Sequence, residues 1–172
     1  INSATVTIAE DEIEDGVALV RKLVKKASKD ERTMQPLSKL TIGFKCGGSD
    51  GFSGITANPL CGYLTDYFTS IGGKVILTEV PEMFGAEKEL LKRCVNENVF
   101  KKAVSMVESF KEYFVSHNQV VYENPSPGNK DGGITTLEEK SSGCITKGGN
   151  SAVTDVLALY EECKTDGLSL LW

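Results

Sequence analysis

The sequence predicts an α/β fold of three layers, in which helices cover both faces of a mainly parallel sheet in a Rossmann-like topology. Two observations support this prediction. Short apolar runs rich in β-branched residues occur at 40–44 and 74–79, as is typical of buried strands. Each run is followed, after a loop, by a segment whose apolar residues recur at helical spacing. Strands that alternate with helices are expected to pair in parallel through right-handed crossovers.

The remaining elements are predicted in chain order. Residues 5–8 form a candidate strand, and an apolar stripe predicts a helix from residue 10 or 11 to residue 27, acidic in its first turn and lysine-rich in its last. A further candidate strand lies at 119–122, and a last strand is expected at 168–172. The other helices are expected at 59–71, 87–94 and 99–117, from 135 onward, and after Gly149, where Val153, Val156, Leu157 and Tyr160 show helical spacing.

Composition limits the classes of protein that this chain can belong to. With 172 residues, 40% hydrophobic and 25% charged, it suits a single soluble α/β domain over residues 1–172. The net charge of −5 argues against a nucleic-acid partner, because phosphate neutralisation needs a basic surface. No apolar run reaches membrane-spanning length, so no membrane partner is expected. The five cysteines are odd in number and lack CxxC pairs, which favours reduced thiols and a cytoplasmic location.

A glycine-rich loop after the first strand is the main candidate site. Four glycines in eight residues allow a ligand to approach the backbone closely. The polar side chains between them can bind the hydroxyls or the carboxylate of a small molecule, although serine and aspartate also bond their own backbone in turns. The residues considered for this role are Gly48, Ser49, Asp50 and Ser53.

The helix after this loop is predicted to present its positive end to a ligand. Asn58 is a preferred N-cap and Pro59 fits the first helical position, so the helix is expected to begin there. The free N–H groups at a helix N-terminus favour an anion. Neither GxxxxGK[ST] nor GxGxxG occurs in the loop, so it matches no phosphate-binding signature.

Cys46 and two glutamates follow the predicted strands. Cys46 lies where a helix N-terminus can favour its thiolate, as a metal ligand or a nucleophile; the alternative is a small packed thiol. Glu79 and Glu82 lie at and just past a strand end, and each can be a general base, a metal ligand or a solvated surface group. His117 is the only histidine and sits near a helix end, which argues against a Ser/His/Asp triad or a histidine-based zinc site within this chain.

Two lysines and an irregular segment complete the candidates. Lys140 and Lys147 flank loops rich in glycine and serine, where a lysine can bind a carboxylate, act as a base or simply be solvated. Segment 122–133 has two prolines and three glycines, which preclude regular structure. Since the carboxyl ends of parallel strands share one edge of a sheet, we expect loops 46–56, 79–86 and 122–133 to meet there.

Several of these loops resemble those of a known family. FKCGGSDGFSGITANPLCG, ILTEVPEMFGAE, NPSPGNKDGGITTLEEKSSGCITKGG and the closing GLSLLW resemble the altronate dehydratase and galactarate dehydratase family of sugar-acid hydro-lyases, over nearly all of residues 39–172. The resemblance implies dehydration of a six-carbon aldonate or aldarate to a 2-keto-3-deoxy acid. It also implies a divalent metal, Fe²⁺ first and Mn²⁺ or Mg²⁺ as alternatives, which would stabilise the enediolate and the leaving oxygen.

The expected roles divide the candidate residues into three groups. Those expected to be catalytic are Asp50, Glu82 and Lys140, and those expected to bind the metal are Cys46 and Glu79. The expected substrate-binding residues are Gly48, Ser49, Ser53, Asn58, Asn124, Ser126, Asn129 and Lys147.

Members of this family are longer, which predicts that the chain is a fragment without an amino-terminal small domain and a carboxyl-terminal remainder. A first residue other than Met and an apolar end at 168–172 favour the same interpretation. The expected partners are therefore the sugar acid, the remaining domains of the same polypeptide and a second copy in a homo-oligomer, and the isolated chain is expected to be inactive. The alternative is a non-catalytic domain that binds an anion or serves assembly.

Overall fold

The computed structural model describes residues 12–172, so the candidate strand at 5–8 lies outside the described residues. The chain divides into two compact units, Ile1–Gln35 and Pro36–Trp172. The first unit contains helix α1 (Glu12–Ala27), which ends where the sequence predicts, with Lys25 and Lys26 in its last turn. Cations in this position interact favourably with the helix dipole.

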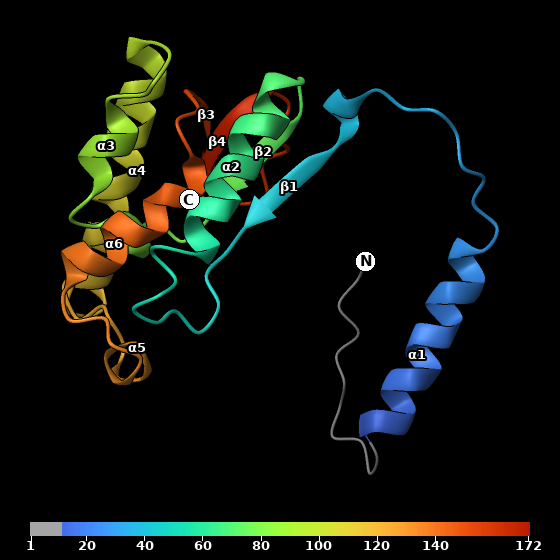
Figure 1. Ribbon diagram of the computed structural model, residues 1–172, viewed down its shortest axis with the longest axis horizontal. Helices are drawn as coiled ribbons and strands as arrows, with labels where there is room; N and C mark the ends of the chain where they lie inside the picture. The colour runs from blue at the N-terminus through green and yellow to red at the C-terminus, as the bar shows by residue number, and fades with distance from the viewer. Residues whose placement is uncertain (1–11) are drawn as a thin grey trace. The chain divides into compact units, whose positions relative to one another are not determined.

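The second unit is built on a four-stranded parallel sheet (Figure 1). The strand order is β1-β2-β4-β3, and all three neighbouring pairs run in parallel. The strands are β1 (Thr41–Phe44), β2 (Lys74–Leu77), β3 (Val153–Leu157) and β4 (Gly167–Leu171). The α/β class and the parallel sheet predicted from the sequence are confirmed, and the loops that follow the strands all leave from one edge.

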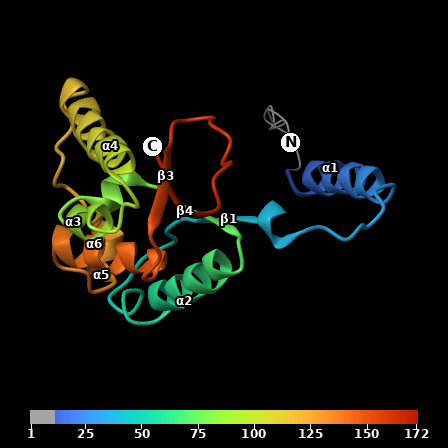
Figure 2. The same ribbon diagram turned by 90° about the horizontal axis from the view of Figure 1, so that it is seen from above.

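Helices surround this sheet and give the expected three-layer α/β arrangement. Figure 2 shows α2 along one side of the sheet and α4 beside β3. The helices are α2 (Ala57–Ser70), α3 (Glu87–Leu91), α4 (Glu97–Ser116), α5 (Pro127–Asp131) and α6 (Leu137–Ile145), with short 3-10 turns η1 (Leu37–Lys39), η2 (Val80–Met83) and η3 (Thr146–Gly148). Within residues 12–172, no helix is both long and apolar enough to cross a membrane.

The core lies between the central strands and α4. Strands β2 and β4 are buried between neighbours, and Val75 and Leu168 are fully inaccessible to solvent. The predicted apolar side of α4 is confirmed at Ala103 and Val107, which are buried in the same cluster. Burying such side chains is the main favourable term in folding and fixes the sheet under the loops that form the site.

Two predicted elements are wrong, and segment 122–133, expected to lack regular structure, contains the short helix α5, in which Pro127 takes the first helical position. The segment from Val153 to Leu157 is strand β3 rather than a helix, because its backbone pairs in parallel with β4, from Val153 beside Leu168 to Leu157 beside Leu171. Helical spacing in so short an apolar run does not separate a helix from a buried strand. Residues 119–122 form no strand; the chain turns after α4, and the amide of Gln119 closes the helix on the carbonyl of Phe114.

The predicted helix caps are partly confirmed. Asn58 does not cap α2; the helix begins earlier, with Thr56 as the N-cap residue, and Asn58 is buried inside its first turn. This occurs because the amide of Asn58 already bonds the carbonyl of Ser53, so the loop itself winds into the helix. At α6, by contrast, the side chain of Thr136 accepts from the amide of Glu139, as predicted for a segment beginning near residue 135.

Candidate functional site

The carboxyl edge of the sheet gathers the three predicted loops. The thiol of Cys46, after β1, and one carboxylate oxygen from each of Glu79 and Glu82, after β2, all lie within 4.8 Å of one another. Asn129, from the third loop, donates through Nδ2 to the carbonyl of Ser49 at 3.0 Å. The expectation that segments 46–56, 79–86 and 122–133 meet at one edge is confirmed.

Glu79 joins the ends of β1 and β2. Its Oε2 accepts a hydrogen bond from the amide of Cys46 at 2.7 Å, and its Oε1 lies 3.5 Å from Lys45 Nζ. Its backbone is in the left-handed region, with φ of 68°. A residue other than glycine in that region costs about 1–3 kcal/mol, and such conformations cluster at functional sites. The strained turn directs the carboxylate of Glu79 across the edge toward Cys46.

Glu82 is the most heavily paired carboxylate of the site. Its Oε1 lies 3.2 Å from Lys140 Nζ, and its Oε2 lies 3.7 Å from Lys147 Nζ. Cys144 also donates to Oε2, with a Sγ–O distance of 3.1 Å. Burial alone would raise the pKa of Glu82, but hydrogen bonds from Cys46 and Cys144 and the charge of Lys140 outweigh it and hold that pKa below its ordinary value. Glu82 is therefore a buried carboxylate that stays ionised at neutral pH.

Lys140 is held by three acceptors. Its ammonium donates to Oδ1 of Asn124 and to Oδ1 of Asn129, each at 2.8 Å, and pairs with Glu82. Asn129 is itself fixed by a capping box with Ser126 at the start of α5. A lysine ammonium has three donors, so these contacts use all of them. The geometry favours Lys140 as a group that holds Glu82 and the asparagines in place.

Two thiols flank the carboxylate of Glu82. Burial, followed by the hydrogen bond and charge of Glu82, raises the pKa of Cys46 to about 12, and the same causes raise the pKa of Cys144 to about 12. The expectation that a helix N-terminus favours the thiolate of Cys46 is therefore wrong for this structure, because burial and the neighbouring carboxylates raise its pKa. Sequence reasoning did not place Cys144 in the site. It lies four residues after Lys140 in α6, a spacing that puts both on one helix face.

The glycine-rich loop contributes differently from residue to residue. Asp50 is exposed, and its Oδ1 accepts from the amides of Phe52 and Ser53 and from the Ser53 hydroxyl, at 2.9–3.0 Å. The hydrogen bonds from Ser53 lower the pKa of Asp50. These contacts match the alternative in which Asp50 and Ser53 bond to the local backbone and shape a turn. At Gly48, an added Cβ would meet no atom within 4 Å, so no close backbone contact explains that glycine.

A small cavity nevertheless unites several predicted residues. Its volume is about 40 Å³. It is lined by Ser49, Asp50, Ser53, Asn58, Lys140 and Cys144, among others. One water molecule occupies about 30 Å³ in the liquid, so this space is far smaller than the roughly 300–1,000 Å³ of ordinary ligand pockets. A sugar acid would need a wider opening than the described residues provide here.

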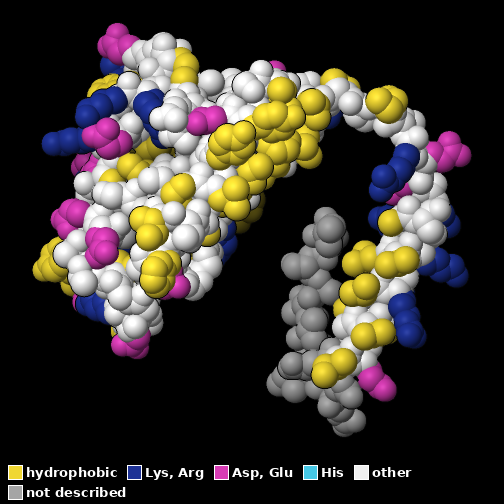
Figure 3. Space-filling model, viewed as in Figure 1, with side chains coloured by type: hydrophobic (Ala, Val, Ile, Leu, Met, Phe, Trp, Pro, Cys, Tyr) yellow, Lys and Arg dark blue, Asp and Glu magenta, His cyan; other side chains and the backbone are white. Residues whose placement is uncertain are grey.

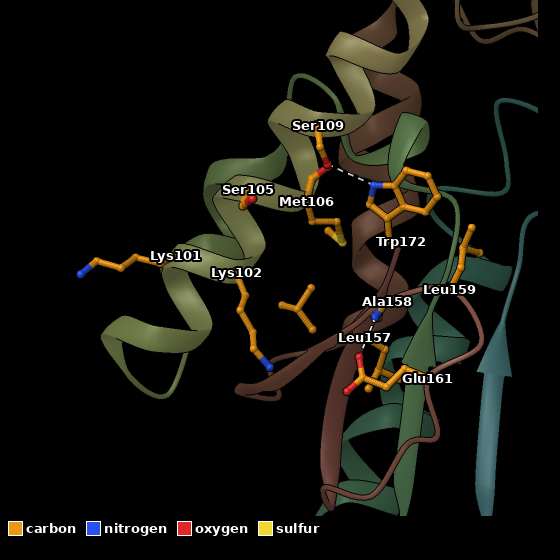
Figure 4. Close-up of a pocket in the computed structure, with 11 residues that line it drawn as sticks. Lys101, Lys102, Ser105, Met106, Ser109, Leu157, Ala158, Leu159, Glu161 and Trp172 are labelled. Carbon is orange, nitrogen blue, oxygen red and sulfur yellow. Dashed lines mark hydrogen bonds between the residues drawn. The ribbon is translucent and has the colours of Figure 1, made fainter.

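A much larger cavity lies elsewhere, between α4 and the ends of β3 and β4. It has a volume of about 750 Å³ and is lined mainly by apolar groups that include Met106, Leu157 and Trp172. Figure 4 shows the Trp172 indole bonded to Ser109 and the side chain of Lys101 directed away from the groove. None of the predicted site residues lines this groove. The larger cavity and the predicted site residues therefore lie in different places. We place the candidate site at the ends of β1 and β2, where the carboxylates, lysines and thiols gather.

The fold and the site together define an α/β domain of the kind that binds small polar molecules at the carboxyl edge of a parallel sheet. Residues 37–172 match the family model described as D-galactarate/Altronate dehydratase, C-terminal, and the chain belongs to this family. The family expected from the sequence motifs is thus confirmed.

Three relatives illustrate the similarity. The chain is 60% identical over 161 residues to altronate dehydratase of Bacillus subtilis (strain 168), covering 94% of this chain and 32% of the relative. It is 55% identical over 162 residues to altronate dehydratase of Escherichia coli (strain K12), covering 94% and 33%. It is 37% identical over 166 residues to galactarate dehydratase (L-threo-forming) of the same organism, covering 92% and 32%. The chain spans about a third of the length of these relatives.

Proposed function

We propose that this chain is part of a hydro-lyase that dehydrates a sugar acid to a 2-keto-3-deoxy acid. Altronate is the favoured substrate, and galactarate is the alternative. The observation that carries the proposal is the ionised, buried carboxylate of Glu82, held between two lysines at the sheet edge. Identity of 60% to an altronate dehydratase, against 37% to a galactarate dehydratase, favours altronate.

The reaction needs a proton removed from C2 and a hydroxyl lost from C3. Glu82 is ionised and can accept or relay a proton, and Lys140 holds its carboxylate in place. Lys147 adds positive charge 3.7 Å from Glu82, which favours an anionic substrate. Ser49 and Ser53 line the small cavity next to Lys140 and carry hydroxyls that can bind those of a sugar acid. Burial strengthens each of these interactions because the local dielectric is low.

The residues present fit a divalent metal. Cys46, Glu79 and Glu82 offer one sulfur and two oxygens within 4.8 Å of one another. Sulfur together with carboxylate suits Fe²⁺ better than Mg²⁺, which prefers oxygen ligands in octahedral geometry. When bound, the metal would supply Lewis-acid stabilisation of negative oxygen. Binding would require Cys46 to lose its proton, so metal affinity should rise with pH.

The test uses the full-length protein, purified without oxygen and loaded with Fe²⁺. Altronate is expected to yield the 2-keto-3-deoxy acid faster than galactarate, and Glu82→Gln is expected to lower turnover at least a hundredfold. Metal content by mass spectrometry should fall in Cys46→Ser and Glu79→Gln, independently of activity. A fully active Glu82→Gln enzyme, or no turnover of either acid by metal-loaded protein, would contradict the proposal. The isolated 172-residue chain is expected to be inactive, because its site cavity is only about 40 Å³.

A second candidate function, assembly, is favoured by an exposed apolar stripe on α2. Leu60, Tyr63, Leu64 and Tyr67 recur at helical spacing and are 37–73% exposed. Figure 3 shows hydrophobic side chains gathered over this helix. Contiguous apolar surface of this kind marks an interaction site. The partner we propose is the rest of the polypeptide, since the relatives are about three times as long as this chain.

Footprinting of tyrosine side chains in the full-length protein tests this role. Tyr63 and Tyr67 are expected to be protected, whereas Tyr160, which is fully exposed, should be modified readily and serves as the control. Equal modification of all three would reject the covered surface. A protected stripe combined with full activity of Glu82→Gln would make assembly the better account of the domain.

A further inference from the structure

Lys147 reaches the carboxylate of Glu82 from η3, a turn of only three residues. Its ammonium lies 3.7 Å from Glu82 Oε2, and both side chains are buried. So short a 3-10 turn has few internal hydrogen bonds to fix its position. The direction of the long lysine side chain therefore depends on what holds the backbone of η3 from outside.

Thr65 in α2 bonds directly to that backbone. Its hydroxyl lies 2.6 Å from the carbonyl oxygen of Lys147, which is 82 positions away in the chain. A threonine within a helix commonly bonds the carbonyl four residues earlier, and Thr65 makes this contact with Cys61 at the longer distance of 3.0 Å. The bond to Lys147 is therefore additional to the usual one. Thr65 is completely buried, so water does not compete for its hydroxyl.

The residues that follow Lys147 are held in the same way. Arg93, just after α3, donates to the carbonyl of Gly148 at 3.2 Å. The carboxylate of Asp66, the neighbour of Thr65 in α2, accepts from the amide of Asn150 at 2.8 Å and from the hydroxyl of Ser151 at 2.6 Å. Side chains from two other elements thus fix the chain from η3 to the start of β3.

We infer that Thr65 is a positioning residue of the site, which acts through the backbone of Lys147 to hold the charge of that lysine beside Glu82. Thr65 lines neither of the two small cavities at the site, so it acts through the turn and not by touching the substrate. The inference rests on the proposed function, in which Glu82 accepts or relays a proton. A misplacement of about 1 Å near the reacting groups can lower the rate about a hundredfold, so a bond that fixes the Lys147 backbone can affect turnover.

A double-mutant cycle in the full-length, Fe²⁺-loaded protein, with altronate as substrate, tests this role. Thr65→Val removes the hydroxyl and keeps the β-branched shape. It is expected to lower kcat/KM roughly 10- to 100-fold in the parent, but by no more than about twofold in Lys147→Met, because residues that act through one another are not additive. Thr65→Ser, which keeps the hydroxyl, should retain most of the turnover. Ser70→Ala is the control, since it removes an exposed hydroxyl from the same helix.

A purely structural role for Thr65 gives a different result. Thr65→Val would then lower kcat/KM by the same factor in both backgrounds, or not at all, and either outcome would overturn the inference. Amide hydrogen exchange in residues 146–151 measures the hold on η3 without substrate. Exchange there should be faster in Thr65→Val than in the parent or Ser70→Ala, and unchanged exchange would also overturn the inference.

Failure of the proposed function is seen in a different protein from failure of the inference. A parent protein that turns over neither acid rejects the proposed function, and the positioning role with it. An active parent in which Thr65→Val has additive effects, or none, rejects the positioning role alone. If Thr65→Val does not fold, Thr65→Cys, whose thiol is a weak donor, takes its place in the same cycle.

Discussion

The ammonium of Lys140 lies 3.2 Å from the carboxylate of Glu82, and the pair joins α6 to the turn that follows β2. Both side chains are buried. A buried ion pair stabilises a protein only when further hydrogen bonds offset the desolvation of its charges. Here Asn124 and Asn129 accept from the lysine, and Cys144 donates to the glutamate. The network explains how a carboxylate remains ionised away from water.

Glu82→Gln should destabilise the protein strongly. The substitution leaves two buried ammonium groups, those of Lys140 and Lys147, without a counter-charge. Removing one partner of a buried ion pair costs about 3–5 kcal/mol. Urea unfolding of the full-length protein measures this change, with Glu97→Gln as a control, because Glu97 forms an exposed pair with Lys101. A Glu82→Gln variant as stable as the control would contradict the buried network.

Stability should fall in acid partly because of Glu82. Its folded pKa lies below its ordinary value, so its contribution is complete above about pH 4.3 and disappears as pH falls through the folded pKa. The stabilities of the parent and Glu82→Gln should therefore converge as pH falls from the ordinary pKa of glutamate through the folded pKa of Glu82, where the parent loses the charge that the variant never has. Thermal unfolding of both proteins from pH 3 to 7 checks this; a stability difference that stays constant over this range would refute it.

Asp50→Asn separates chemistry from structure in the glycine-rich loop. The side chain is exposed, and an asparagine keeps the Oδ1 that accepts from Phe52 and Ser53. The free energy of unfolding should change by no more than about 0.5 kcal/mol. If Asp50 transfers a proton, turnover should fall about a hundredfold. Steady-state kinetics with altronate, beside urea unfolding, decide the matter: normal turnover would leave Asp50 with the role of shaping the turn.

Gly62→Ala should disturb the packing of α2 on η3. A Cβ at this position would overlap the carbonyl oxygen of Thr146 and would approach Gly149 Cα to 3.1 Å. Overpacking of this kind costs about 1–3 kcal/mol. The matched control is Gly128→Ala in α5, where an added Cβ meets no atom within 4 Å. Tm should fall in the first variant and hold in the second. Because η3 carries Lys147, the first should also bind the sugar acid less well.

Local patterns in the sequence were sufficient to predict most strands, the long helix and the parallel sheet. Short apolar runs identified β1, β2 and β4, and the stripe through Ala103 and Val107 identified α4. Parallel pairing followed from the alternation of elements, and it placed Cys46, Glu79 and Glu82 at one edge before any distance was known. These inferences succeed because secondary structure and burial leave a periodic signal in neighbouring residues.

Other features were decided only by tertiary structure. Strand β3 is a strand because β4 is beside it, and a run of five residues does not specify its own partner. Cys144 enters the site through a contact with Glu82, which lies 62 positions earlier in the chain. Lys140 and Lys147 look alike in the sequence, yet Lys140 has three acceptors, whereas Lys147 pairs with Glu82 alone at 3.7 Å among the contacts of the described residues. The sequence alone determined which chemical groups reach the edge of the sheet; packing between distant segments determined their partners and charge states, because burial and hydrogen bonding depend on neighbours in space.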